Sequence, residues 1–225
     1  MKPILPAFTP IDRETWSRTP YYDYYRTQLK TKYTISIKID ITVLLATYKA
    51  KGYKFFPTFL YVIMRALNNS EALRTCIHQG QLGVWNFLSP QFTLFHDDDK
   101  TFSDLWSDYY GDFPSFHRAI TQDIEQYKNV KGIKVKSGLP ANFVPISCVP
   151  WISFESISQD TSDDTDFLKP IIRFGKYYQE QERVLIPLSV YVNHAIADGY
   201  HTAAFLNDIQ HLATNVNSWL TTENK

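Results

Sequence analysis

The chain has 225 residues, of which 44% are apolar, so it can bury a sizeable core. Its 23 basic and 23 acidic residues balance, which argues against binding to nucleic acid or to an anionic membrane surface. We find neither an apolar run long enough to span a membrane nor the apolar segment of a signal peptide. The two cysteines, Cys76 and Cys148, predict no disulfide framework and fit a cytoplasmic protein.

The first third of the chain predicts one strand and two helices. Residues 33–39 alternate between apolar and polar side chains like a half-buried strand. Asp40 is placed to cap a helix that ends near Gly52. Pro57 suits the first turn of a second helix. The apolar face of that helix carries Leu60, Met64 and Leu67.

In the middle of the chain, residues 81–87 and 91–96 predict a pair of strands joined through residues 88–90. A polar turn at residues 97–100 follows. A third helix is then predicted by apolar residues at helical spacing, which are Phe116, Ile120, Ile124 and Tyr127.

The last third predicts strands around residues 143–155, 170–177 and 183–193. A final helix is expected to bury Phe205, Ile209, Leu212, Val216 and Leu220. The chain shows no repeat, low-complexity tract or linker, so residues 1–225 are expected to form a single domain. Strands and helices mix without a strict βαβ rhythm. The predicted fold class is therefore α/β, a two-layer fold with a mixed β-sheet covered by helices.

The most informative segment lies where the strand at 183–193 ends. His194 follows that strand, with Asp198 four residues on and Gly199 opening the final helix. A histidine can exchange a proton with an alcohol near pH 7, and catalytic groups are often held on loops between rigid elements. The alternative is that His194 is a buried structural histidine and Asp198 only a helix cap. A metal site is disfavoured, because the interval from His194 to His201 is not a zinc spacing and no cysteine is near.

Residues 194–201 resemble the signature of the chloramphenicol acetyltransferases, His-x-x-x-Asp-Gly followed by an aromatic residue and His. The resemblance extends over residues 10–215, because further segments fall at the family's intervals. These are residues 53–57, 90–96, 101–103, 150–154 and 187–189. The His-to-Asp-Gly element alone is shared with dihydrolipoyl acyltransferase cores, but those proteins carry lipoyl domains and long linkers for which this length leaves no room.

The resemblance implies direct transfer of acetyl from acetyl-CoA to a hydroxyl of chloramphenicol, without an acetyl-enzyme. It implies His194 as the general base and an Asp198–Arg18 pair that holds the loop. Ser147 matches the serine that stabilises the oxyanion of the tetrahedral intermediate; the alternative is an ordinary strand hydroxyl. The protein is thereby expected to be an enzyme that confers antibiotic resistance.

Further positions follow from the same resemblance. Acetyl-CoA is expected as co-substrate, with no metal, and its channel would be lined by Lys54, Trp151 and Tyr177; each could equally be a surface or core residue. The family is trimeric with active sites between subunits, so a homotrimer is expected. The positions matching the acceptor pocket are Tyr25, Leu29, Tyr33, Phe102, Ile171 and Arg173.

The sequence departs from the family at several of its pocket positions. Asn193 replaces a histidine that is not the base, so the chemistry should survive. Lys134, Gln159 and Arg173 stand where the family has an aromatic residue, a leucine and a threonine. Either these side chains point away, or the acceptor is more polar or acidic than chloramphenicol. A third possibility is that nearby acidic residues neutralise them, namely Asp163, Asp164 and Asp166.

The leading hypothesis is therefore an acetyl-CoA-dependent O-acetyltransferase for chloramphenicol or a related small molecule. One alternative is the same reaction with a more polar acceptor. A different class, a non-catalytic relative that binds small molecules, would not need His194, Asp198, Arg18 and Ser147 together. A lipoyl-linked acyltransferase is the third candidate.

Overall fold

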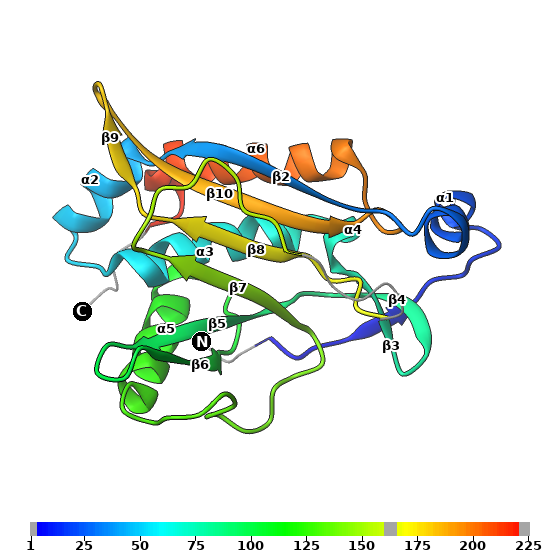
Figure 1. The fold of residues 1–225 in the computed structure, drawn as a ribbon, viewed down its shortest axis with the longest axis horizontal. Helices are drawn as coiled ribbons and strands as arrows, with labels where there is room; N and C mark the ends of the chain where they lie inside the picture. The colour runs from blue at the N-terminus through cyan, green and yellow to red at the C-terminus, as the bar shows by residue number, and fades with distance from the viewer. Residues whose placement is uncertain (1–3, 160–165, 221–225) are drawn as a thin grey trace.

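A seven-stranded mixed sheet crosses the molecule in the computed structural model, which describes residues 4–159 and 166–220 (Figure 1). The strand order is β2-β10-β8-β7-β5-β6, and β9 extends the sheet beside β10. Strand β7 runs parallel to β5 and β8, and the other pairs are antiparallel. The strands are β2 (Lys32–Asp40), β5 (Ser89–His96), β6 (Thr101–Trp106), β7 (Phe143–Val149), β8 (Ile171–Gly175), β9 (Tyr178–Glu180) and β10 (Arg183–Asn193).

One face of this sheet is apolar because directly opposite residues on neighbouring strands point to the same side. A row of register partners crosses six strands on that side. It consists of Ile35, Val190, Ile172, Ile146, Phe92 and Leu105. Helices cover this face. Phe59 packs on Phe174, with ring centroids 5.1 Å apart, and Phe56 packs on Phe92 at 5.4 Å.

The covering helices are α2 (Thr42–Ala50), α3 (Phe55–Asn69), α5 (Phe113–Tyr127) and α6 (Gly199–Thr214). Helix α3 contacts both α5 and α6, which explains why it is buried on nearly every side. Shorter helical segments are α1 (Thr19–Asp23), the π-helix η1 (Tyr24–Gln28), α4 (Glu71–Arg74) and the 3₁₀ turn η2 (Val216–Ser218).

The opposite face carries a polar row, made of the residue next to the apolar one on each strand. Its members are Ser36, Ser189, Arg173, Ser147, Thr93 and Asp104. The Ser36 hydroxyl donates to Ser189 Oγ at 3.1 Å, and Thr93 Oγ1 lies 3.5 Å from Ser147 Oγ. The predicted mixed sheet with helices on it is confirmed, and its two faces differ in chemistry.

The predicted pairing of residues 81–87 with 91–96 is wrong. Strand β4 (Gln81–Trp85) instead pairs with β1 (Phe8–Pro10) and β3 (Thr75–His78) in a separate three-stranded sheet. The reason is the tight turn at Gln79 and Gly80, whose φ angles of 50° and 78° suit a two-residue hairpin. Strand β5 then leaves to pair with β6 and β7.

Two predicted element ends also shift. The strand expected to continue to residue 155 ends at Val149, directly before Pro150. The final helix ends at Thr214, and Val216 and Leu220 are buried beyond it. The cap of α2 is Ile41, although the Asp40 carboxylate still accepts from the Thr42 backbone N–H at 2.9 Å.

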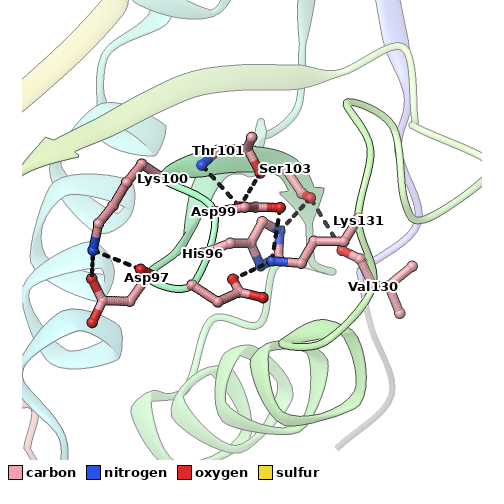
Figure 2. Close-up of polar contacts among 9 residues, drawn as sticks. His96, Asp97, Asp99, Lys100, Thr101, Ser103, Val130 and Lys131 are labelled. Atoms are coloured by element: carbon pink, nitrogen blue, oxygen red, sulfur yellow. Dashed lines mark hydrogen bonds and ion pairs between the residues drawn. The ribbon is translucent and has the colours of Figure 1, made fainter.

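The β5–β6 hairpin is anchored by a buried hydrogen-bond relay and an exposed charge cluster (Figure 2). His96 Nε2 lies 2.7 Å from Ser103 Oγ, which in turn donates to the Val130 carbonyl at 3.2 Å. Since the hydroxyl has one proton, His96 must donate through Nε2. On the surface, Lys131 pairs with Asp98 and with Asp99, the latter at 3.2 Å.

Substituting Ser103→Ala removes the only acceptor recorded for His96 Nε2 among the described residues. His96 is 3% exposed and Ser103 is fully buried, so we expect a loss of about 1–3 kcal/mol in the free energy of unfolding. Denaturant titration measures it. The matched control is Lys131→Gln, which breaks exposed pairs to the same hairpin and should change stability little. Equal losses in the two variants would contradict the buried relay.

Candidate active site

The loop after β10 is held by Arg18, which lies 180 positions earlier in the sequence than Asp198. Arg18 Nη1 donates to Asp198 Oδ2 at 2.9 Å, and Nη2 donates to the His194 carbonyl at 3.1 Å. The His194 backbone N–H donates to the Thr31 carbonyl at 3.0 Å. The predicted pair of Arg18 and Asp198 is therefore present, and one guanidinium fixes both ends of the loop.

Asp198 also starts helix α6. Its Oδ1 accepts from the Tyr200 backbone N–H at 3.1 Å and lies 2.8 Å from His201 Nδ1. Burial alone would raise the pKa of the Asp198 carboxyl, but hydrogen bonds from Arg18 and His201 and their charges lower it to about 2. The carboxyl is thus ionised at neutral pH and accepts hydrogen bonds from both the Arg18 side chain and the start of α6.

The His194 ring lies between two tyrosines. Tyr25 stacks on it with ring centroids 3.9 Å apart and an interplanar angle of 11°, and Tyr33 meets it edge-on at 5.1 Å. The Tyr33 hydroxyl is itself fixed 2.7 Å from Thr202 Oγ1. His194 Nδ1 is buried and has no hydrogen-bond partner among the described residues, so Nε2 is the nitrogen that can meet a ligand.

Two cavities meet at Ser147, a member of the polar row. The larger has a volume of about 990 Å³ and the smaller about 240 Å³. Phe92, Thr93 and Ser147 line both. A hydroxyl at such a junction can reach a group that joins two ligands, one in each cavity, which is the arrangement that group transfer needs.

The larger cavity contains all three residues predicted for acetyl-CoA. Lys54 lines it, and Tyr177 packs edge-on against Phe55 at 5.3 Å. Trp151 is 57% exposed and meets Phe95 edge-on at 4.6 Å. Lys100 and Lys176, which the sequence reasoning missed, also line it. Apolar walls with lysines around them suit a long thiol ester that carries phosphates.

His117 supports the start of helix α3 at this cavity. Its Nε2 accepts from the Lys54 backbone N–H at 3.1 Å. Burial, together with the positive charge of Lys54, lowers the pKa of His117 to about 4, so the ring is neutral at pH 7 and keeps its acceptor. The histidine thereby holds the backbone that carries the Lys54 side chain.

The smaller cavity contains Ile171 and Arg173, as predicted for the acceptor pocket, together with Gln159. Arg173 Nη2 donates to Gln159 Oε1. Asp104 also lines the cavity and was not predicted; burial raises the pKa of its carboxyl and the charge of Lys134 opposes that shift. Its position became visible only from the strand register.

The other predicted acceptor residues lie outside the smaller cavity in this chain. Phe102 lines the larger cavity, and Leu29 is exposed at the end of η1. Tyr25 and Tyr33 contact His194 instead. Lys134 is exposed, and its backbone forms a bridge to Asp104, whose carboxyl its charge also influences.

Of the acidic residues offered as neutralising partners, Asp166 pairs with Arg26 at 2.7 Å. Asp163 and Asp164 lie outside the described residues. Among the described residues, no group of three metal-ligating side chains and no helix long and apolar enough to cross a membrane is found. The expected absence of a metal stays a prediction.

His194 does not line either cavity. It follows Ser189 of the polar row by five positions, and a strand rises about 3.3 Å per residue, so it lies about 17 Å further along β10. Ser147 is two strands across from Ser189. One chain therefore brings Arg18, Asp198, Tyr25 and Tyr33 to His194, but it does not bring His194 to Ser147.

Comparison with known proteins agrees with this architecture. The family model for chloramphenicol acetyltransferase matches residues 6–210. A chloramphenicol acetyltransferase of Clostridium perfringens is 40% identical over 95% of this chain and 98% of its own length. One of Staphylococcus aureus is 35% identical over 95% of this chain and its full length. The chain belongs to the chloramphenicol acetyltransferase family. It is accordingly an acyltransferase.

Solved structures support the fold. A chloramphenicol acetyltransferase superimposes with a TM-score of 0.79 at 19% identity, covering 92% of this chain and all of that one. The dihydrolipoamide acetyltransferase of Azotobacter vinelandii gives a TM-score of 0.66 at 16% identity, covering 88% of each chain. At these identities the likeness establishes the fold alone.

The substitution Asp198→Asn keeps an acceptor oxygen for the α6 cap and removes the charge that binds Arg18. We expect the free energy of unfolding at pH 7 to fall by about 1–2 kcal/mol, a modest loss because 38% of the Asp198 side chain is exposed. The folded pKa of about 2 lies below the ordinary 3.8, so this contribution is complete above pH 4 and disappears as the pH falls toward 2.

Urea denaturation of the wild type and the variant at pH 7, 4 and 3 measures the effect. Asp208→Asn changes an exposed carboxylate on the same helix and is the control. A difference between wild type and Asp198→Asn that stays constant down to pH 3 would rule out an ionic contribution from Asp198.

Proposed function

We propose that this protein transfers acetyl from acetyl-CoA directly to a hydroxyl of chloramphenicol or a related small molecule, and so confers resistance to the antibiotic. The observation that carries the proposal is the position of Ser147 between a large apolar cavity with lysines and a small polar one. Acetyl-CoA occupies the large cavity and the acceptor the small one. The curated relatives bear the name chloramphenicol acetyltransferase.

In the proposed reaction His194 Nε2 removes the proton of the acceptor hydroxyl, and the alkoxide oxygen attacks the thioester carbonyl carbon. The Ser147 hydroxyl donates to the oxyanion that forms. The intermediate then collapses, the carbon–sulfur bond breaks, and the imidazolium returns its proton to the CoA thiolate. Tyr25, stacked on the ring, stabilises the transient cation through its π-face.

The base must reach the acceptor within hydrogen-bond distance, yet within one chain His194 lies on the order of 17 Å or more from the polar row. We therefore propose a homotrimer in which His194 of one chain faces the Ser147 cavities of the next. In a three-fold ring each chain contributes one half of two different sites. Leu29, exposed beside this loop, and Phe102 then border the acceptor from the two chains.

Within the larger cavity we assign Lys54 to the phosphates of acetyl-CoA, and Trp151 and Tyr177 to its adenine and pantetheine portions. The single domain is proposed to span residues 1–225 and to act in the cytoplasm, where acetyl-CoA is made. The competing class, a non-catalytic binding protein, predicts saturable binding of chloramphenicol without release of CoA thiol.

The substitution His194→Ala should lower kcat by roughly 10²–10⁴, because it removes the general base while the loop keeps its backbone hydrogen bonds. The measurement is thiol release from acetyl-CoA with saturating chloramphenicol. His211→Ala, exposed near the end of α6, is the control and should stay near wild type. His201 is unsuitable as a control because it contacts Asp198. Near-normal turnover of His194→Ala would contradict the assignment of His194 as the general base.

Mixed oligomers test whether the site is shared. His194→Ala and Ser147→Ala chains are each expected to be impaired, the latter by roughly 10²–10³ in kcat with little change in KM. When the two are co-expressed, random assembly of a three-fold ring restores an intact His194–Ser147 pair at about a quarter of the sites. Activity near that fraction of wild type is expected. The control mixture combines His194→Ala with Ser189→Ala, a change in the same polar row. The Ser189→Ala protein is expected to be active by itself.

If co-expression gives no more activity than the better parent while the mixed oligomers are present, His194 and Ser147 do not act across an interface. Native mass spectrometry of differently tagged chains measures the share of mixed oligomers. The same measurement reports the number of chains, and a monomer would contradict the trimer directly.

A further inference from the structure

Arg173 occupies the middle of the polar row, where its neighbours are serines. Its register partners are Ser147 on β7 and Ser189 on β10. The whole residue is 5% exposed, and its side chain lines the smaller cavity with Gln159 and Ile171. A cation has thus been placed inside the cavity that the proposed function assigns to the acceptor.

The charge of Arg173 is not balanced by the described residues. Nη2 donates to the neutral Gln159, and Nη1 is buried without a hydrogen-bond partner among the described residues. Burial lowers the pKa of the guanidinium, a sign that the charge has lost solvation, yet arginine stays protonated. A buried cation with an unused donor is strongly unfavourable unless an anion pairs with its charge and accepts its hydrogen bond.

The carboxylate in the same cavity does not meet this need. Asp104 lies on β6, and three steps between strands separate it from Arg173 on β8. At about 4.8 Å per step, the two positions are about 14 Å apart across the sheet. Of the nearer hydroxyls, Ser189 Oγ donates to the Ile157 carbonyl at 2.8 Å, and Tyr191 interacts with Arg173 in the direction that raises the arginine pKa.

We propose that Arg173 is a specificity-determining residue that binds a planar anionic group, a carboxylate, on the acceptor molecule. This inference rests on the proposed function, because it assumes that the smaller cavity holds the acceptor. The guanidinium offers Nη1 to the carboxylate while Gln159 holds Nη2 in place. The preferred acceptor is then a hydroxyl compound that carries a carboxylate, and neutral chloramphenicol is a weaker one.

Benzoate and nitrobenzene provide a matched pair of probes. Both carry a planar group with two oxygens on a benzene ring and differ in charge, and both are small enough for the cavity of about 240 Å³. The experiment measures their inhibition of acetyl transfer to chloramphenicol at saturating acetyl-CoA, and their binding by calorimetry in the absence of turnover.

Benzoate should compete with the acceptor about ten- to a hundredfold better than nitrobenzene, as expected for a charge-assisted hydrogen bond in a buried site. Arg173→Met keeps the length of the side chain, removes the charge and should abolish the preference. Arg183→Met, an exposed arginine of β10 paired with Glu180, is the control and should retain it. Thermal melting verifies that each variant folds, and Arg173→Gln is the second variant if Arg173→Met does not.

Equal inhibition by the two probes in the wild-type protein would overturn the proposal. So would a preference for benzoate that survives loss of Arg173, because the anion would then bind elsewhere, for example at the lysines of the larger cavity. If benzoate binding depends on Arg173 but acetyl-CoA gives no thiol release with any hydroxyl acceptor, the proposed function fails and the anion site remains.

Discussion

The large sheet has two chemically different faces, and the rest of the molecule depends on that difference. Neighbouring residues of a strand point to opposite sides, so the apolar row from Ile35 to Leu105 and the polar row from Ser36 to Asp104 occupy adjacent register positions. The apolar row is buried under helices and supplies the core. The polar row faces away from the core, which is why Ser147 can be rigidly held and still line two cavities.

Sequence reasoning located the elements that have strong local signals and missed contacts that depend on tertiary pairing. The strand ending at Asn193 and the loop with Asp198 were predictable, because the apolar run and the cap are both local. The partnership of Arg18 with Asp198 came only from the resemblance to a family. The sheet to which residues 81–85 belong was mispredicted, since a short turn to β5 was mistaken for a hairpin while the hairpin at Gly80 was overlooked.

The same limitation applies within the site. Arg173 was suspected because its charge departs from the family pattern, whereas Asp104 and Thr93 carry no sequence signal of their own. They enter the polar row only through the register of β5 with β6 and β7. Residue type can therefore nominate a base or an oxyanion donor, but which side chains face a common cavity is decided by strand register, and a shift of one residue would exchange the two faces.

Three positions of the proposed acceptor pocket differ from the family pattern, and Arg173 is the one whose surroundings do not balance its charge. Lys134 is also charged where the family is apolar, but it is exposed, so water solvates it and no partner is required. Gln159 finds a partner in Arg173. Among the described residues of the polar row, the Arg173 guanidinium combines charge, burial and a donor without a partner. An acceptor with an anionic group would pair with this buried charge beside the proposed oxyanion donor and stabilise it. The unpaired guanidinium therefore points to the chemistry of the acceptor.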